Sequence, residues 1–595
     1  MDLVVFAFGH ALVLLALGWT AWSAGTLVAP FWRHEQPALP AGFRLALGFA
    51  ILTQLLLLLG LLGQLRPQQI VLVMGALVMA AARPAFFELR QAWPAARAGA
   101  SSQLAVVALL LFLPVFTLAL YPPLGFDQTL YHLPFVKAFA ASGGMPFLGD
   151  LRFPVFPQLA EVLQATLYLA AGEIASQLAG LAALTAFLVL LYAWAGEKGG
   201  REAGLLAVAM VAGSPCAVYV ATCGYVEPQL ALFSLAALYA AERASRGNLP
   251  AWALAAGFLA GSAAATKYHG LFFLGMSGLL LLPWGNWRAA PRSWWPRLAL
   301  FAVAAAVAAL PSYGRIVAYT GNPLFPFFSE FFGAGPYTEE TMLPRGTQRW
   351  LRVLTYFWDI SFRRDLVGHL PAWSPVFLLA LPMAGVALHF PRWRRPALVA
   401  LLFWLLSPIH AHYFLAIAGV WAVVVAAALQ WLLGEEPRRR RLLVIGAALV
   451  ALGGPAYALY RIHLLGPPAA TRAGQDQLLA KNLPLYPAIL FLDGAAADGR
   501  VFGAGPVVAR MTSYYSGTLL GDVNGVDSVA RIASRATELG SLAAALAEIG
   551  ADYALIDRAE NAWLELADRD PRLELAYQDE NAKIYRLRGR PPGPS

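Results

Sequence analysis

The stretch YPPLGFDQTLYHLPFVKAF, residues 121 to 139, decides how this chain is organised. It leaves an apolar run, yet it is too apolar for a solvated loop and too broken by proline and glycine to cross a bilayer. Residues 129 to 141 have the apolar spacing of a helix that lies in the membrane interface, and Pro157 opens a second helix of this kind. The loop 121 to 173 is therefore predicted to form a platform at the membrane surface.

The sequence on either side of this loop is that of a membrane protein. Of its 595 residues, 59% are hydrophobic and 13% are charged, which is more apolar surface than one soluble core can hide. Apolar runs close to the ~20 residues that cross a bilayer recur along the chain, for example at 3 to 30, 45 to 63, 103 to 120 and 441 to 459. We expect an all-α polytopic membrane domain.

The net charge of +9 comes from arginines in short clusters between the apolar runs. They do not form the continuous basic face that binds nucleic acid, so a nucleic-acid partner is not expected. Basic clusters mark cytoplasmic loops, and this rule gives about 14 spans. The N-terminus, the loops 121 to 173 and 315 to 370, and everything after about residue 462 are then outside. The bias toward Ala, Leu, Arg and Gly is typical of GC-rich bacteria, so we expect the bacterial inner membrane.

The composition changes after Arg461, where charges become regular and the apolar runs shorten. We expect a separate soluble α/β domain over residues 462 to 595, on the periplasmic side. Its predicted elements are strands at 488 to 494, 499 to 505 and 551 to 557, a helix over 527 to 549 and a hairpin over 573 to 588. No glycine-rich phosphate loop opens a helix there, which argues against a nucleotide site.

Asp127 stands where the chain leaves an apolar span, shortly before Tyr131 and His132. A carboxylate at this boundary is costly unless it is solvated, paired or in use. The structural alternative is that Asp127 caps the helix that starts near Thr129. His132 and His269 also have two interpretations, because each can contact a donor phosphate or a sugar hydroxyl, or simply pack.

The remaining charged candidates of the outer loops have structural alternatives as well. Asp150 fits a turn, and Glu161 can complement the dipole of its helix. Lys267, in ATKYHGLF (265 to 272), returns to the outer boundary, where it can pair with a lipid-linked phosphate or extend to the lipid headgroups. The same two interpretations hold for Arg315.

Disulfide and metal chemistry have little support in the sequence. Cys216 and Cys223 are the only cysteines, and they lie in or beside one apolar segment, so they support neither a disulfide framework nor a cysteine metal site. His410 and His412 flank Ala411 at a short outer turn, a spacing too thin to predict a metal site.

Three outer-loop segments resemble those of a known superfamily. They are FDQTLYHLPFVKAF (126 to 139), PFLGDLRFPVFPQLAEVL (146 to 163) and GNPLFPFF (321 to 328). The pattern is similar to that of bacterial membrane glycosyltransferases of the GT-C superfamily, the family 39-like relatives of protein O-mannosyltransferases and aminoarabinose transferases. The resemblance covers about residues 103 to 430, in pattern more than in identity. It implies a GT-C catalytic domain over 103 to 461, with residues 1 to 102 as additional N-terminal transmembrane helices.

The resemblance also implies roles for particular residues. In this superfamily the first large outer loop bears an acidic residue essential for transfer, and Asp127 is the position that matches. A second acidic residue often lies in a later outer turn, and Glu227 in CGYVEP (223 to 228) is its counterpart, although Asp is commoner there. The loop has no DxD, so the metal-dependent oligosaccharyl branch matches less well. No cofactor is expected to be required, and the sequence leaves a divalent metal undecided.

The implied donor is a sugar on a polyprenyl-phosphate carrier, and the implied acceptor is a hydroxyl of a lipid, glycan or protein on the periplasmic side. The leaving phosphate needs cations, whereas the acceptor hydroxyl must lose a proton to a positioned carboxylate, for which Asp127 is the candidate. Direct displacement inverts the anomeric centre. The residues expected to bind donor or substrate are Tyr131, His132, Asp150, Glu161, Lys267, His269 and Arg315.

Two other classes of protein compete with a transferase. A secondary transporter also has many spans, but it usually shows internal repeats and interrupted segments at mid-membrane depth, which this sequence does not display. A scaffold or receptor would leave Asp127 and the interfacial loop without a role. We therefore expect a glycosyltransferase.

Overall fold

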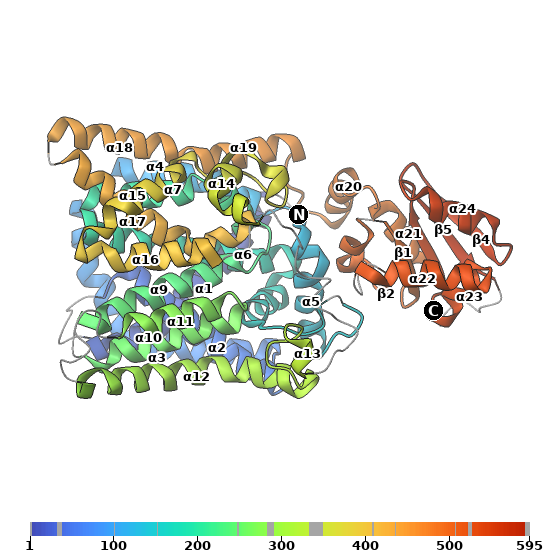
Figure 1. The fold of residues 1–595 in the computed structure, drawn as a ribbon, viewed down its shortest axis with the longest axis horizontal. Coiled ribbons are helices and arrows are strands. Elements are labelled where there is room, and N and C mark those ends of the chain that lie inside the picture. The colour runs from blue at the N-terminus through green and yellow to red at the C-terminus, as the bar shows by residue number, and fades with distance from the viewer. Residues whose placement is uncertain are drawn as a thin grey trace.

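The computed structural model describes residues 3–32, 39–99, 102–151, 153–246, 249–282, 291–332, 349–406, 410–434, 436–505, 507–521 and 526–588. A helical domain extends to about residue 465, and a small mixed α/β domain follows it. Figure 1 shows the long helices side by side in one bundle, with the α/β domain beyond one end. We call this the outer end, because it also carries α5 (Leu133–Ser142) and α13 (Ser329–Phe332), from loops predicted to lie outside.

The bundle is built almost entirely from helices. Its first half comprises α1 (Leu3–Val28), η1 (Ala29–Trp32), α2 (Ala41–Leu61), α3 (Pro67–Gly99), α4 (Ser102–Leu118), η2 (Gln128–His132), α5, α6 (Leu159–Gly199), α7 (Arg201–Ala212), α8 (Pro215–Thr222) and α9 (Glu227–Arg246). Its second half comprises α10 (Pro250–Thr266), α11 (Gly270–Leu280), α12 (Pro291–Thr320), α13, α14 (Arg349–Phe362), η4 (Arg364–Leu366), η5 (Pro375–Leu379), α15 (Ala380–Leu388), α16 (Pro391–Leu406), η6 (Ala411–Phe414), α17 (Leu415–Leu433), α18 (Pro437–Ala451) and α19 (Gly453–Leu465).

Several of these helices have the length and composition of membrane spans. Among the described residues, 6 helices meet both requirements, and α7 with α8, bent by 64°, makes 7 if the pair is one span. The six are Leu3–Trp32, Ala41–Leu61, Leu159–Gly199, Trp294–Thr320, Ala411–Leu433 and Pro437–Leu465. The predicted multi-span helical domain is therefore confirmed, whereas the finer count of about 14 spans stays a prediction.

Helix α10, which ends directly before Lys267, packs closely against α12. A Cβ atom on Gly257 would lie 2.1 Å from the carbonyl oxygen of Phe301, and one on Gly261 would lie 2.4 Å from that of Ala305. Small residues of this kind let helix backbones approach each other closely inside a membrane domain. Larger side chains there would push α10, and with it Lys267, away from α12.

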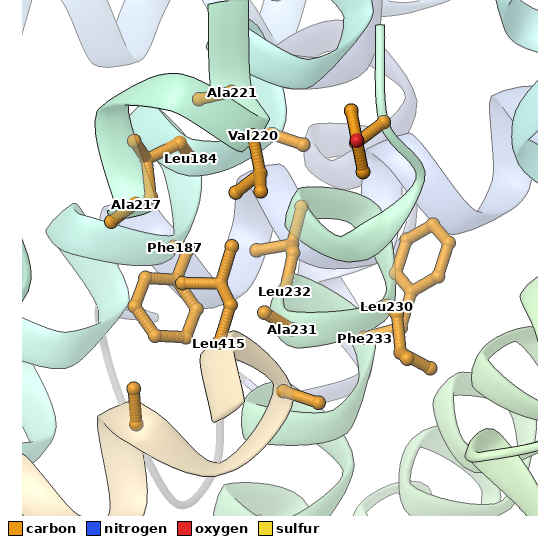
Figure 2. Close-up of a cluster of buried hydrophobic side chains, with 14 of the residues drawn as sticks. Leu184, Phe187, Ala217, Val220, Ala221, Leu230, Ala231, Leu232, Phe233 and Leu415 are labelled. Carbon is orange, nitrogen blue, oxygen red and sulfur yellow. The ribbon is translucent and has the colours of Figure 1, made fainter. Parts of the chain in front are cut away.

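A buried apolar core holds the N-terminal ends of α9 and α17 next to each other. The side chains that meet there include Leu184 and Phe187 of α6, Ala217 and Val220 of α8, Leu232 of α9 and Leu415 of α17 (Figure 2). Because interiors of this kind are close-packed, the first turns of both helices have little freedom to shift. Glu227 opens α9, and the short helix η6 leads into α17.

Both helices predicted for the outer loop are present, but they continue into longer elements. The first contains one π turn, η2, and runs on as α5, with the predicted apolar residues Leu130, Leu133 and Val136 buried. The second is the first part of α6, which breaks at Gly172 and then continues as a membrane span. The helix predicted after Pro157 is thus confirmed up to that break, and its position in the membrane interface stays a prediction.

The α/β domain contains a five-stranded sheet in the order β2-β1-β3-β5-β4. Strand β1 pairs in parallel with β2 and β3, and β5 pairs antiparallel with β3 and β4. Its elements are α20 (Arg472–Asn482), α21 (Tyr486–Ala496), β1 (Arg500–Ala504), η7 (Val508–Ser513), β2 (Thr518–Gly521), α22 (Val526–Leu539), α23 (Leu542–Glu548), β3 (Tyr553–Asp557), α24 (Asn561–Arg569), β4 (Leu573–Gln578) and β5 (Ala582–Leu587). Helices α22 to α24 cover one face of the sheet, while α21 and η7 pack on the other.

The sequence predicted most of this domain correctly. The strands near 499 to 505 and 551 to 557 and the hairpin over 573 to 588 are confirmed, but the strand predicted at 488 to 494 is wrong. Those residues form α21, whose buried Tyr486, Ile489 and Leu492 recur every third residue. A short apolar run does not by itself distinguish strand from helix. The single helix predicted over 527 to 549 is two helices, α22 and α23, and β2 was not predicted.

Candidate active site

Asp127 lies in the first turn of the helix that continues into η2 and α5. Its backbone is already helical, with φ −64° and ψ −33°, and among the described residues its side chain makes no capping hydrogen bond. The capping alternative is therefore wrong. The side chain is 21% exposed. Its Oδ2 accepts a hydrogen bond from the Tyr131 hydroxyl at 3.3 Å, and its amide donates to the Tyr225 hydroxyl at 3.4 Å.

The helix that carries Asp127 continues in a π turn with two aromatic rings in contact. The amide of Leu133 donates to the carbonyl of Gln128, five residues back, which widens the helix by one residue. Tyr131 then packs beside His132, with 4.2 Å between their ring centroids. Because π turns occur frequently at functional sites, this local irregularity is a second reason to place the site here.

Glu227 and Lys267 form a buried ion pair next to Asp127. The Lys267 ammonium lies 2.5 Å from Glu227 Oε1. The side chain of Lys267 is 15% exposed and that of Glu227 is 0% exposed. Lys267 also lies over the ring of Tyr413, 4.8 Å from its centroid, a favourable cation–π position. The lysine is thus turned toward the protein, and the alternative in which it extends to the lipid headgroups is not what the structure shows.

His412 links the two carboxylates. Its Nε2 lies 3.8 Å from Asp127 Oδ2 and 3.8 Å from Glu227 Oε1. The structure therefore brings together side chains from the outer loop, α9, the end of α10 and η6. The sequence identified Asp127, Glu227 and Lys267 but did not assign a role to His412, although HAHY directly before an apolar run was an available signal.

His132 and Glu161 form a second pair in the same region. Their Nδ1 and Oε1 atoms are 2.7 Å apart, and both side chains are buried. Glu161 lies in the first turn of α6, yet its role is not only to complement the helix dipole, because it has this direct partner. The pair connects the Asp127 helix to α6.

The other predicted binding residues are placed differently. Arg315 is buried, and its guanidinium donates to the carbonyls of Met145 and Phe156 and to the side chain of Gln158, so it braces the outer loop. Asp150 is exposed in a turn of that loop. His269 packs on Tyr413 at the edge of the cluster, with 4.4 Å between ring centroids.

Several buried polar atoms of this site make no hydrogen bond to any described residue. They are Gln128 Nε2, His132 Nε2, Glu161 Oε2, Glu227 Oε2, His269 Nδ1, and both ring nitrogens of His412. Each such group costs about 1–3 kcal/mol when it is left without a partner. Native proteins rarely concentrate this cost in one place without a use, so these atoms are candidates to bind a polar ligand. No group of three or more His, Cys, Asp or Glu side chains in the described part of the chain is placed to hold a metal ion.

The opposite end of α9 carries another buried charged cluster, which we call the inner cluster. Glu242 accepts hydrogen bonds from Lys198, from Arg246 at 2.7 Å and from the Trp194 indole at 2.9 Å. Both carboxylate oxygens of Glu242 are therefore used. This cluster ties α6 to α9 and is chemically complete.

Comparison with known proteins agrees with the predicted superfamily. The family model "Dolichyl-phosphate-mannose-protein mannosyltransferase" matches residues 157–313. The crystal structure of ArnT from Cupriavidus metallidurans bound to undecaprenyl phosphate is similar with a TM-score of 0.54 and 16% identity, over 82% of this chain and 98% of that chain. Its apo state gives 0.54 and 14% over the same shares. No curated protein matches the chain in sequence at a significant level. The membrane domain has the GT-C fold that the outer-loop motifs predicted.

Proposed function

We infer that this chain, a membrane glycosyltransferase of the GT-C superfamily, moves a sugar from a polyprenyl-phosphate carrier to an acceptor hydroxyl. We place the reaction at the outer end of the bundle, on the periplasmic side of the bacterial inner membrane. The acceptor is a lipid, a glycan or a protein side chain. The position of the candidate site supports this proposal, because the Asp127 turn runs on into α5, at the end of the bundle that also carries α13 and the α/β domain (Figure 1).

Asp127 is the proposed general base. The observation that carries this assignment is the contrast between the two carboxylates of the site. Glu227 is fully buried and neutralised by Lys267, whereas Asp127 is 21% exposed and, among the described residues, forms no ion pair with a lysine or arginine. A carboxylate that is accessible and not neutralised can accept the proton of an attacking hydroxyl. Direct attack by that hydroxyl on the anomeric carbon gives inversion.

Lys267 and His412 are the proposed groups on the leaving-phosphate side. A lipid phosphate leaves with negative charge, and preorganised cations and hydrogen-bond donors stabilise such charge strongly in a site that excludes bulk water. Glu227 holds the Lys267 ammonium in place before the donor arrives. When the donor phosphate approaches, the same ammonium has further N–H donors to offer it.

The donor is proposed to approach from the bilayer. ArnT, which shares the fold, was crystallised with undecaprenyl phosphate. A lipid carrier has its phosphate at the membrane surface, and we place the Asp127 loop at that level because the chain continues from it into the apolar helix α6. A resident cofactor is not part of the proposal, because the phosphate carrier already activates the sugar.

The test is transfer by the full-length chain in membranes. Radiolabelled undecaprenyl-phosphate hexoses and pentoses are offered one at a time, and label in lipid, glycan and protein fractions is measured. We expect Asp127→Asn to lower transfer by roughly 10²–10⁴-fold, the usual contribution of a general base. Asp365→Asn, at an exposed aspartate elsewhere on the outer side, is the matched control. Equal transfer by the Asp127→Asn variant and the parent would remove this residue from the mechanism.

A further inference from the structure

The α/β domain reaches back to the chain on both sides of Asp127. Four hydrogen bonds join the segment 510 to 514 to the outer loop, and three of them end on carbonyls that flank Asp127. The Arg510 guanidinium donates to the Leu124 carbonyl at 2.9 Å, the Tyr514 hydroxyl donates to the Pro123 carbonyl, and the Ser513 hydroxyl donates to the Thr129 carbonyl at 2.6 Å. In the fourth, Lys137 of α5 donates to the Ser513 carbonyl at 2.5 Å.

The bond from Ser513 supplies what the helix around Asp127 lacks. In an α-helix the Thr129 carbonyl would accept the amide of residue 133, but Leu133 donates to Gln128 in the π turn. The next residue along is Pro134, which has no amide hydrogen. The π turn and the proline therefore leave the Thr129 carbonyl without a helical donor. A buried carbonyl needs a partner, and the hydroxyl of Ser513 provides one from another domain.

The segment that makes these contacts is itself held rigidly. Helix η7 lies in the connection between the parallel strands β1 and β2, and Val508 and Met511 are buried in the core that η7 shares with the sheet. Arg510 additionally lies over the ring of Phe126, 5.6 Å from its centroid. Because η7 is fixed to the sheet, its contacts also fix the positions of Phe126 and Thr129, on either side of Asp127.

We propose that the α/β domain completes the active site, with Arg510 and Ser513 as positioning residues that set the place of Asp127. This inference rests on the proposed function of Asp127. Three of the four hydrogen bonds end on the backbone on either side of the base, and the fourth joins α5 of the same outer loop, so none of the four ends on a long span. Loss of a positioning contact lowers the rate of the chemical step, because a displacement near 1 Å is worth about 100-fold in rate.

The test compares three single-residue variants of the full-length chain with the donor that the parent accepts. Ser513→Ala removes one oxygen, and Ser513→Thr restores a hydroxyl. Thr512→Ala is the control, since that hydroxyl donates to Ala509 within η7. We expect Ser513→Ala to lower kcat by about 10- to 100-fold with little change in KM for the donor. Ser513→Thr should recover most of the loss, and Thr512→Ala should resemble the parent.

A second measurement does not depend on turnover. In the parent, backbone amides of residues 126 to 133 should exchange hydrogen slowly, and Arg510→Ala should speed their exchange while leaving α9 unchanged. Parent-like kcat and parent-like exchange in Ser513→Ala and Arg510→Ala would overturn the positioning role. If Asp127→Asn loses transfer at the same time, the proposed function stands and only this inference fails. If Asp127→Asn keeps full transfer, the proposed role of Asp127 as the general base fails, and the positioning role that rests on it fails as well.

Discussion

The two ends of α9 carry buried glutamates in opposite chemical situations. Glu227 opens the helix and Glu242 lies near its other end, about 22 Å away at 1.5 Å per residue. Each is paired with a lysine from a neighbouring segment, Glu227 with Lys267 and Glu242 with Lys198. At the inner end both carboxylate oxygens have donors, while at the outer end Glu227 Oε2 makes no hydrogen bond to any residue that the structure describes.

This difference separates a structural use of charge from a functional one. A charge inside a membrane domain is tolerated when it is paired and hydrogen-bonded, and the inner cluster satisfies both conditions within the protein. The outer site is left partly unsatisfied, and an accessible aspartate lies beside it. A cluster whose polar atoms are all hydrogen-bonded within the protein serves the fold, whereas a cluster with unpartnered polar atoms can bind a polar ligand.

The sharpest test of this contrast removes each ion pair as a unit. In Lys267→Met with Glu227→Gln, neither charge remains buried alone, so the fold should survive. If the Lys267 ammonium acts on the leaving phosphate, transfer should still fall by roughly 10²–10³-fold, as for loss of one preorganised donor. The inner counterpart, Lys198→Met with Glu242→Gln, should transfer sugar at close to the parental kcat. A parental rate for the outer double variant would show that Lys267 only neutralises Glu227.

A substitution in the inner cluster should lower the stability of the chain and leave its kcat unchanged. In Glu242→Gln, the buried Lys198 loses its carboxylate, and breaking such a pair costs about 3–5 kcal/mol. We expect a clearly lower melting temperature for the purified chain, with an unchanged kcat per folded molecule. Thermal unfolding followed by tryptophan fluorescence, together with the transfer assay, measures both quantities. A variant that melts like the parent but transfers more slowly would reverse the assignment of the two clusters.

The sequence alone predicts some residues of this site, but not the contacts between them. Asp127 and Lys267 were found because a charge beside an apolar span is conspicuous in the sequence, and Glu227 was found through the resemblance to the GT-C superfamily. Their mutual contacts depend on how α9 and α10 pack, and no local pattern encodes that. His412 was missed for the same reason, because a histidine at a short turn is informative only once its neighbours are known.

The local sequence pattern also gave a wrong prediction where the same pattern fits two kinds of secondary structure. The apolar run within 486 to 496 fits a strand or a helix, and packing against the sheet decided for the helix α21. Arg315 was predicted to bind the donor, but its guanidinium is engaged by loop carbonyls, and a donor-binding role for it stays a prediction. The contact of η7 with the Asp127 loop joins residues nearly 400 positions apart, which only the folded chain reveals.

A smaller effect is expected from the hydroxyl that contacts Asp127. Burial, followed by the charge of Asp127, raises the pKa of Tyr131 well above its ordinary value, so the phenol stays protonated and donates at all working pH values. Tyr131→Phe should therefore lower kcat by about 3- to 10-fold, the worth of one hydrogen bond of about 1 kcal/mol. The loss should be the same from pH 6 to pH 9. A loss that grows with pH would mean that the phenol ionises in the site.

The smallest effect concerns His410, which lies at the rim of the outer site. Burial lowers the pKa of His410 from its ordinary value, against attraction by Asp127 and with repulsion from Lys267. Below about pH 6.5 the histidine of the unfolded chain takes up a proton while His410 of the folded chain does not. The free energy of unfolding therefore keeps its full value above that pH and decreases as the pH falls toward the lowered pKa of the folded chain. His410→Gln removes this pH-dependent contribution, so the melting temperature of the variant should fall less than the parent's between pH 7.5 and pH 5.5.

The control is His389→Gln, at a histidine that follows α15, which should keep the parental pH dependence. An equal fall in the His410→Gln variant and the parent would show that this histidine does not titrate differently in the folded chain, and that the outer site does not extend to it.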